Sequence, residues 1–410
     1  MDSDQAIIIS RETACVGEIR LALKAFNPFL TVTEIDPSQQ MEQLAAILDA
    51  GEPLVIFIQA DDPEAAEYCA GEIRKAGRQN RTIAAYRQID NTSFLALRRQ
   101  GVQECVQLPN DRDRLQEILR TFSSECQGVP AAVEHRTAAA SGRFLSFVPA
   151  KPGAGTSTAA AHFAHYAAEL IGARVALVDL DMNCGVQGLM ARSEKNASMI
   201  QAAQYAGRME DSIWDRLTTH AGLVDVLPAT HRSLNTRIEA ARFDSLLSYL
   251  QGRYPLVIFD HSGNLERYSV TVLERSAQIF SICAPDLSTV HQARRSMELF
   301  EDLRLRSKVS IVMTRDTAAT GLSRQTVLSM LGTQPIASLP NAFSSLQTAL
   351  IAGGLAGRNS PYGRAVRAFT SQVLADQRVA VPVAGASRPD SWSGFRSAFS
   401  RLKSSAVAVR

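Results

Sequence analysis

The sequence predicts an α/β protein with two parallel-sheet domains in series and a short amphipathic tail. Three observations support this prediction. Apolar runs of strand length alternate with helix-length runs, a glycine-rich turn joins one strand to a helix in mid-chain, and two segments rich in Ala, Pro and Gly interrupt the pattern. Strands that alternate with helices form parallel sheets covered by helices on both faces.

Length and composition set the limits of this prediction. The 410 residues suffice for two or three domains of ~100–200 residues each. The net charge of +2 is too small to indicate a nucleic-acid or membrane partner, so a basic patch must be local. We find no signal peptide and no apolar run long enough to span a bilayer. The six cysteines are scattered without a C-x-x-C pair, which favours reduced thiols in the cytosol.

Composition also predicts the domain boundaries. Residues 127–143 and 379–391 lack helical or strand periodicity and have the composition of linkers. The expected organisation is an N-terminal domain 1–126, a linker 127–142, a second domain 143–376, and a linker with tail 377–410.

The first domain consists of alternating strand-like and helix-like runs. Repeats of this kind in so short a length predict a flavodoxin-like domain. The expected strands are 6–10, 30–36, 53–59, 81–86 and 104–108, and the expected helices lie near 15–25, 38–50, 63–76, 92–100 and 111–125.

That layout resembles the receiver domain of response regulators. Receivers need an acidic pair after the first strand, a phosphate-accepting Asp after the third and a Lys after the fifth. This chain has Ser10 and Arg11 in the first place, Gln59 in the second and Leu108 in the third. Without clustered carboxylates there is no Mg²⁺ site, and without the Asp no acyl phosphate forms.

Two acidic residues lie close to the missing acceptor. We interpret Asp61 and Asp62 as residues of a solvated loop and not as substitutes for the lost Asp. The first domain is therefore predicted to be an atypical receiver that docks a partner. A phosphorylation-controlled regulator is disfavoured by Gln59 and Leu108.

The second domain begins with a strand, a glycine-rich loop and a helix. The strand is GRFLSFVPA (142–150), and the Ala-rich helix 157–172 ends at Gly172. A phosphate loop requires this context, and backbone N–H groups at a helix N-terminus hold phosphate oxygens without a lysine. Gly153 and Gly155 permit close approach of the backbone. The alternative is a tight turn before a buried helix.

Carboxylates follow two other apolar runs. One run ends in Asp179 and Asp181, and another ends in Asp260. Beside a phosphate loop, a carboxylate at the end of a parallel strand can orient Mg²⁺ or its water ligands. The alternative is that each Asp caps the turn that follows it.

The segment KPGAGTST (151–158) resembles the deviant phosphate loop K-G-G-x-G-K-[ST]-[ST] of the ParA/MinD ATPases. The resemblance implies ATP and Mg²⁺ bound in a nucleotide-sandwich homodimer, in which Lys151 reaches the partner's phosphates. It implies that Asp181 positions the attacking water and that Asp260 and Gly263 form the second switch. It assigns Lys151 and Asp181 to catalysis, Ser157 and Asp260 to Mg²⁺, and Lys151, Gly153, Ala154, Gly155, Thr156, Ser157, Thr158, Asp260, Gly263, Thr314, Arg315 and Pro340 to the nucleotide.

Two longer stretches narrow the resemblance. Residues 206–229 and 338–369 are similar to the TadZ/CpaE branch, which helps to assemble Tad-type (Flp) pili and also carries a receiver-like N-terminal domain. The resemblance covers nearly the whole chain. It implies a cytoplasmic assembly and localisation factor, peripheral to the inner membrane and polar, whose partner is the Tad secretion ATPase or a polar marker protein.

The chain departs from the ParA/MinD pattern at three positions. Thr156 replaces the lysine that contacts the β and γ phosphates, Pro152 replaces a glycine and removes a backbone donor, and Thr314 replaces an Asn that helps to recognise adenine. Loss of a buried cation beside a triphosphate weakens binding or transition-state stabilisation. We therefore expect ATP binding with weak or absent hydrolysis.

The tail predicts an amphipathic helix. Its apolar residues follow helical spacing and its charges are basic, so the segment 391–403 suits an anionic membrane or, alternatively, a protein surface. The apolar positions are Trp392, Phe395, Phe399 and Leu402, and the basic ones are Arg396, Arg401 and Lys403.

Two further groups of side chains have structural interpretations. His162 and His165 have no third ligand, so we expect helix packing or exposure to solvent and not a metal pair. A DNA-binding ParA-type partition ATPase is the alternative function, and a basic cluster is its candidate surface. We expect that cluster to be a solvated face without a nucleic-acid partner; it comprises Arg294, Arg295, Arg304, Arg306 and Lys308.

Overall fold

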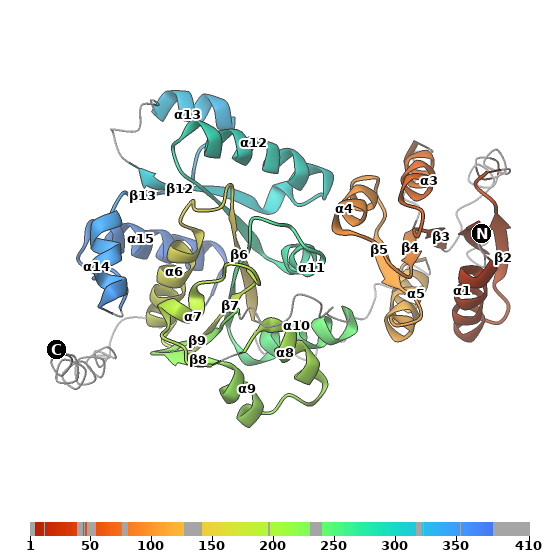
Figure 1. Ribbon diagram of the computed structural model, residues 1–410, viewed down its shortest axis with the longest axis horizontal. Coiled ribbons are helices and arrows are strands. Elements are labelled where there is room, and N and C mark those ends of the chain that lie inside the picture. The colour runs from red at the N-terminus through yellow and green to blue at the C-terminus, as the bar shows by residue number, and fades with distance from the viewer. Residues whose placement is uncertain are drawn as a thin grey trace, which may run out of the picture.

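The computed structural model describes residues 5–11, 13–38, 44, 46, 55–75, 81–126, 142–195, 197–229, 240–316, 322, 324–352 and 354–379. Two sheets lie side by side, and helices cover both faces of each (Figure 1). The predicted α/β class with mostly parallel sheets is confirmed. The predicted linker 127–141 and the amphipathic tail 391–403 lie outside the described residues.

The smaller sheet, as far as the structure describes it, has the order β2-β1-β3-β4-β5 with parallel neighbours. This is the flavodoxin-like order that the alternating pattern predicts. The helix expected at 38–50 falls almost entirely outside the described residues. The strands are β1 (Gln5–Ile9), β2 (Thr31–Ile35), β3 (Val55–Gln59), β4 (Thr82–Tyr86) and β5 (Glu104–Gln107).

Helices pack on both faces of the smaller sheet through two separate apolar clusters. Alternate residues of each strand point to opposite faces, so Ile7 and Ile9 join one cluster while Ala6 and Ile8 join the other. One face is covered by α1 (Thr13–Phe26) and α5 (Arg112–Cys126), and the other by α3 (Pro63–Lys75) and α4 (Asn91–Arg99).

The larger sheet has the order β13-β12-β11-β6-β10-β7-β9-β8 within the described residues, and β8 is antiparallel to its neighbour β9. The phosphate-loop strand β6 therefore lies between β10 and β11. The strands are β6 (Arg143–Pro149), β7 (Val175–Asp179), β8 (Thr219–Ala221), β9 (Val224–Leu227), β10 (Leu256–Asp260), β11 (Gln278–Cys283), β12 (Val309–Asp316) and β13 (Ala337–Pro340).

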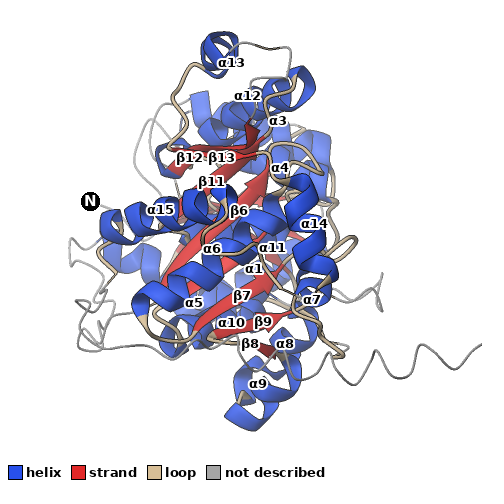
Figure 2. Cartoon of the chain, turned by 90° about the vertical axis from the view of Figure 1, so that its left-hand side faces the viewer, coloured by secondary structure: helices blue, strands red, loops and turns tan. Residues whose placement is uncertain are grey.

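Helices surround the larger sheet on both faces (Figure 2). None of the helices among the described residues combines the length and hydrophobicity needed to cross a bilayer. The helices are α6 (Thr156–Ile171), α7 (Gln187–Met190), α8 (Met199–Tyr205), α9 (Asp211–Leu217), α10 (Ala240–Arg253), α11 (Arg267–Arg275), α12 (Leu287–Asp302), α13 (Arg324–Leu331), α14 (Phe343–Ile351) and α15 (Pro361–Asp376), with short 3₁₀ turns at Ala206–Arg208 and Arg306–Lys308.

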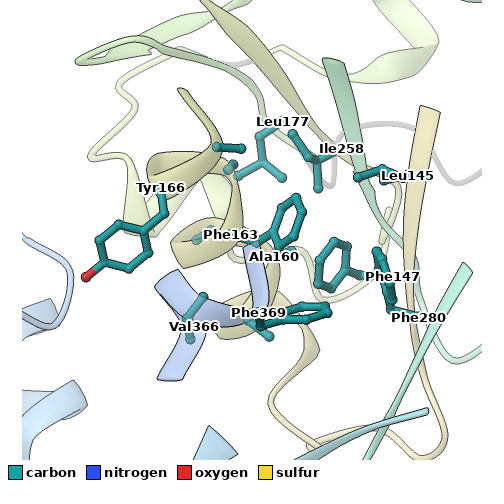
Figure 3. Close-up of a cluster of buried hydrophobic side chains, with 14 of the residues drawn as sticks. Leu145, Phe147, Ala160, Phe163, Tyr166, Leu177, Ile258, Phe280, Val366 and Phe369 are labelled. Carbon is teal, nitrogen blue, oxygen red and sulfur yellow. The ribbon is translucent and has the colours of Figure 1, made fainter. Parts of the chain in front are cut away.

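The core of the larger domain holds α6 against the sheet. Phe147 of β6 lies between Phe163 of α6 and Phe280 of β11, with ring centroids 5.2 and 5.0 Å away (Figure 3). Phe369 of α15 packs on Phe280 at 5.1 Å. Small alanines let α6 approach the strands closely, and Gly172, at φ 73°, ends the helix as predicted. This packing fixes the N-terminus of α6 at the carboxyl edge of the sheet.

Candidate nucleotide site

The loop between β6 and α6 has the backbone geometry of an anion cradle. Gly153 and Gly155 have φ values of 85° and 95°, a region that residues with a side chain rarely adopt. Gly155 is the N-cap of α6, and no side chain of the described residues caps this turn. The first N–H groups of a helix have no intrahelical acceptor, so those of α6 are available to an anion.

Two neighbouring residues brace this loop. The hydroxyl of Thr314 donates to the carbonyl of Ala154, and the guanidinium of Arg315 donates to the carbonyl of Gly153, both at 2.6 Å. Thr314 and Arg315 thus end β12 directly against the loop. The sequence placed Thr314 at an adenine-recognition position, and in the structure its hydroxyl is bonded to the loop backbone.

The segment after β10 packs on the same loop. A Cβ atom at Gly263 would lie 2.9 Å from Pro152 Cγ, so a side chain at position 263 would collide with the loop. This contact explains why a glycine suits position 263. It also places the predicted second-switch residue directly against the predicted phosphate loop.

Two buried carboxylates meet at the edge of the sheet beside the loop. Asp179 and Asp260 are register partners on adjacent strands and are 0% and 1% exposed. Burial raises the pKa of both carboxyls, and the charge of Asp260 raises the pKa of Asp179 further. Both carboxyls can be ionised in this buried position only if a cation balances their charge, and Mg²⁺ prefers such oxygen ligands.

Gln187 links these elements, and the sequence analysis did not identify it. Its Nε2 donates to Asp260 Oδ2 at 2.8 Å and to the carbonyl of Ser157 at 3.0 Å. Its backbone N–H donates to Asp179 Oδ2 at 3.0 Å. No short-range pattern predicts this role, since Gln187 lies 73 residues from Asp260 along the chain.

Several buried polar atoms of this site have no hydrogen-bond partner among the described residues. They are Thr156 Oγ1, Gln187 Oε1 and Asp260 Oδ1. An unsatisfied buried polar group costs about 1–3 kcal/mol, so their positions fit a ligand that supplies oxygens and a cation. In the described part of the chain no three His, Cys, Asp or Glu residues are grouped to hold a metal. A Mg²⁺ ion held by Ser157 and Asp260 would therefore need water molecules or phosphate oxygens as further ligands.

Asp181 is used as a turn cap in this structure. Its Oδ1 accepts hydrogen bonds from the N–H groups of Asn183 and Cys184, at 3.1 and 2.9 Å. Its own N–H donates to Asp179 Oδ1 at 3.1 Å. The sequence analysis left open that these carboxylates cap the turns that follow them. Asp181 does so in this structure.

Lys151 lies exposed at the rim of the loop. Its Nζ donates to Ser288 Oγ at 2.8 Å, and Ser288 Oγ donates in turn to Asp286 Oδ1 at 2.7 Å. Burial would raise the pKa of Asp286, but hydrogen bonds from Thr289 and Ser288, together with the Lys151 charge, lower it. To reach a partner's phosphates, as the resemblance implies, Lys151 would have to leave Ser288.

The remaining predicted residues surround the same edge. Ser157 and Thr158 lie in the first turn of α6, and Pro340 ends β13 opposite Asp316. His162 is buried and bonded at both ring nitrogens, to the Thr158 carbonyl and the Ala356 N–H, as expected for helix packing. Burial lowers the pKa of His162 to about 4, so its imidazole is neutral near pH 7.

The corresponding edge of the smaller sheet is closed by internal hydrogen bonds. Gln59 Oε1 accepts from the Ser10 hydroxyl at 2.7 Å and from the Arg11 N–H at 3.1 Å. Arg11 also forms an ion pair with Asp62 at 3.1 Å. These residues line a cavity of about 190 Å³. The place of a phosphate-accepting Asp is thus taken by an amide that its neighbours already bind.

The other acidic residue at this edge supports the backbone. Asp61 Oδ1 accepts from the N–H of Arg87 at 2.7 Å and from that of Gln88 at 3.3 Å. Leu108, where the resemblance to a receiver would place a lysine, is 3% exposed. Asp61 is therefore a loop residue, as expected, although it is half-buried and bonded and not freely solvated.

Comparison with known proteins identifies the larger fold. No protein-family model and no curated protein matches the chain. A ParA family ATPase from Chlorobium tepidum TLS matches with 19% identity and a TM-score of 0.50, over 57% of this chain and 99% of that chain. The chain contains a ParA/MinD-type ATPase fold.

Other solved structures with this ParA/MinD-type fold are less similar. MinD from Pyrococcus horikoshii OT3, complexed with Mg-ADP, has 15% identity and a TM-score of 0.45, over 58% of this chain and 99% of its own. A putative plasmid partition protein from Borrelia burgdorferi B31, bound to AMPPNP, has 16% identity and a TM-score of 0.47, over 58% and 99%. At 19% identity, the likeness to the ParA family ATPase establishes the fold alone.

Proposed function

We propose that this protein is a Tad (Flp) pilus assembly and localisation factor of the TadZ/CpaE type. It acts as a ParA-like scaffold that binds Mg-ATP and dimerises, with weak or absent hydrolysis. The observation that carries nucleotide binding is the loop itself, in which left-handed Gly153 and Gly155 open α6 beside two buried carboxylates. The pilus role is supported by the sequence resemblance of residues 206–229 and 338–369.

The loop can hold phosphates without a lysine at position 156. The N–H groups of the first turn of α6 donate to phosphate oxygens, and the dipole of the helix favours negative charge there. The hydroxyl of Thr156 is buried and without a partner in the described chain, so it can donate to a phosphate. Bound Mg²⁺, held by Ser157 and Asp260, supplies the positive charge that position 156 lacks.

Two observations support weak turnover. Thr156 cannot stabilise the charge that develops on the transferred phosphate, and fixed charges at that position contribute strongly to catalysis. Asp181 already accepts two N–H groups of its own turn, so it would need to leave them to orient water. Binding without rapid hydrolysis suits an assembly switch whose state persists.

Isothermal titration with Mg-ATP tests the nucleotide site. We expect binding by the native protein and affinity at least about 10-fold weaker in Ser157→Ala, because a Mg²⁺ ligand is lost. The matched control is Ser345→Ala, an exposed serine of α14 that should bind like the native protein. Absence of binding heat in the native protein would overturn the proposed function.

Light scattering after size exclusion tests the dimer. We expect a dimer with Mg-ATP that is weakened in Lys151→Ala, because the resemblance places this lysine on the partner's phosphates. Lys75→Ala, which removes an exposed lysine of the smaller domain paired with Glu72, is the control. An ATP-dependent dimer that survives Lys151→Ala would contradict the trans role of Lys151.

The tail segment 391–403 carries the membrane part of the proposal. We expect the full chain to sediment with vesicles of anionic lipid and a chain ending at Asp390 to remain in solution, because the basic amphipathic segment is removed. Equal sedimentation of both would assign the tail to a protein contact.

The alternative function, a DNA-binding partition ATPase, has little support from the basic cluster. Lys308 Nζ donates to the Glu274 carbonyl at 2.7 Å, and Arg306 donates to the Val309 carbonyl at 3.5 Å, so part of the cluster is bonded to the protein itself. A filter-binding assay distinguishes the two functions. Retention of DNA that depends on ATP and falls steeply with salt would favour the partition ATPase.

A further inference from the structure

One arginine of the larger domain makes several contacts with the smaller domain. Figure 1 shows α11 on the side of the larger sheet that faces α4 of the smaller domain. The Arg267 guanidinium lies over the Tyr86 ring at 4.6 Å and the Phe94 ring at 5.5 Å from their centroids. It also donates to the Tyr86 hydroxyl at 2.5 Å and the Ile89 carbonyl at 3.2 Å. Arg267 thus forms stacking and hydrogen-bonding contacts together, which lysine cannot reproduce.

Other contacts extend this interface along α11. Asn91 Nδ2 of α4 donates to the Leu265 carbonyl at 2.8 Å, just before α11 begins. Val270 is 1% exposed and belongs to the same apolar cluster as the smaller sheet. Arg98 of α4 forms an ion pair with Glu274. The smaller domain therefore packs on α11 and on Leu265 just before it, and ion pairs of Arg99 with Asp302 and of Arg114 with Asp244 extend the interface to α12 and α10.

The same segment touches the candidate nucleotide site. Gly263 packs on Pro152 of the phosphate loop, as described above. The Tyr268 hydroxyl donates to the carbonyl of Leu180 at 3.2 Å, and Leu180 directly precedes Asp181. Residues 263–268 therefore contact the phosphate loop and the Asp181 turn on one side and the smaller domain on the other.

We propose that residues 261–266 and α11 couple the nucleotide site to the receiver-like domain, with Arg267 as the positioning residue at the domain contact. The inference rests on the proposed nucleotide binding. The segment is held at Gly263 by Pro152 and at Arg267 by Tyr86, so a shift at the first contact is transmitted to the second. A nucleotide can shift this segment only if it binds more tightly to the protein in one position of the segment than in the other.

Coupling of this kind acts in both directions. If nucleotide changes the docking of the smaller domain, loss of docking must change nucleotide affinity by the same factor. Typical couplings change affinity by about 5- to 150-fold. A purely structural Arg267 would lower the melting temperature on replacement and leave the affinity for Mg-ATP as it was.

The test uses the full chain and three variants. Arg267→Ala removes the contact from the larger domain, and Asn91→Ala weakens it from the smaller one, which guards against misfolding of either variant. Arg294→Ala, an exposed arginine of α12, is the matched control. Titration with Mg-ATP gives the affinity, and hydrogen exchange of the amides of α4, with and without Mg-ATP, reports the docking.

We expect the affinity to change at least about 5-fold in Arg267→Ala and in the same direction in Asn91→Ala. We expect Mg-ATP to alter exchange in α4 of the native protein and of Arg294→Ala, but not of Arg267→Ala. The coupling is overturned if both contact variants bind Mg-ATP with the native affinity, or if hydrogen exchange in α4 of the native protein is the same with and without Mg-ATP. Either result leaves the proposed function intact. No binding by the native protein overturns both.

Discussion

The carboxyl edges of the two sheets differ in how their polar side chains are satisfied. In the smaller sheet, the side-chain oxygen of Gln59 accepts hydrogen bonds from Ser10 and Arg11. In the larger sheet, the hydroxyl of Thr156 has no partner among the described residues.

This difference separates a closed site from an open one. A buried polar atom without a partner costs free energy, whereas one bonded internally has no need of a ligand. At the smaller edge Gln59 Oε1 is bonded by its own neighbours, while Asp61 Oδ2 is a buried atom without a partner in the described chain. The larger edge leaves Thr156 Oγ1, Gln187 Oε1 and Asp260 Oδ1 for something else to bind. The two edges thus differ in how many buried polar atoms their own side chains satisfy.

The largest effect is expected from a variant that removes a predicted Mg²⁺ ligand at the carboxyl edge of the larger sheet. We expect Asp260→Ala to weaken Mg-ATP binding at least about 100-fold, because it removes a Mg²⁺ ligand from a desolvated position where electrostatic interactions are strong. Titration calorimetry measures the change. Asp376→Ala, an exposed carboxylate at the end of α15, should bind like the native protein. Equal affinity in both variants would show that Asp260 is only structural.

A second variant would restore the missing charge. We expect Thr156→Lys to tighten Mg-ATP binding about 10-fold or more, since a charge-assisted hydrogen bond contributes about 1.5–3 kcal/mol. The rate of ATP hydrolysis, followed by phosphate release, should rise as well. Weaker binding in this variant would mean that the loop has adapted to Thr156 and has no room for a cation.

The buried carboxyl of Asp260 at the larger edge can also be tested without nucleotide, through the dependence of protein stability on pH. Folding raises the pKa of Asp260, so its contribution to stability is present below the unfolded-state pKa and is lost as pH rises through the raised value. From about pH 4 to pH 7, the nucleotide-free protein should lose about 1 kcal/mol or more relative to Asp260→Asn. Urea unfolding at several pH values measures this difference. A constant difference would show that the carboxyl titrates normally.

The smallest effect is expected at the closed edge. Gln59→Ala removes the acceptor of the Ser10 and Arg11 hydrogen bonds and should destabilise the protein by about 1 kcal/mol. Its affinity for Mg-ATP should equal that of the native protein, which titration checks. A loss of affinity in this variant would show that the two edges are linked by more than the contact at Arg267.

Much of the fold followed from local patterns in the sequence. Strands β1 to β5 of the smaller sheet, strands β6, β7 and β10 of the larger one and the end of α6 at Gly172 were predicted, because periodicity and glycine placement act within a few residues. Strands β8, β9, β11 and β13 were not predicted. The two sheets and the strand order of the smaller one were predicted from the alternation of elements. The Ala-rich helix was also predicted, and for His162 the structure shows helix packing, one of the two expected environments.

Other features depended on pairs of residues that lie far apart in the chain. Gln187 joins Asp260 to Ser157, and Thr314 and Arg315 brace a loop about 160 residues earlier. For Asp181 the sequence analysis offered two roles, in catalysis or as a cap of its own turn, and could not choose between them. The sequence gives these side chains no distinguishing pattern, because their partners are set by how the strands align.

By itself, then, the sequence determined which segments become strands and helices and where glycines let the backbone approach an anion, since backbone sterics and apolar periodicity are local. Only the tertiary structure decided which polar groups are satisfied internally and which are left for a ligand. The same structure placed Arg267 on the receiver-like domain, 181 residues from Tyr86. Hydrogen bonding and burial depend on neighbours in space, and the packing of the two sheets determines those neighbours.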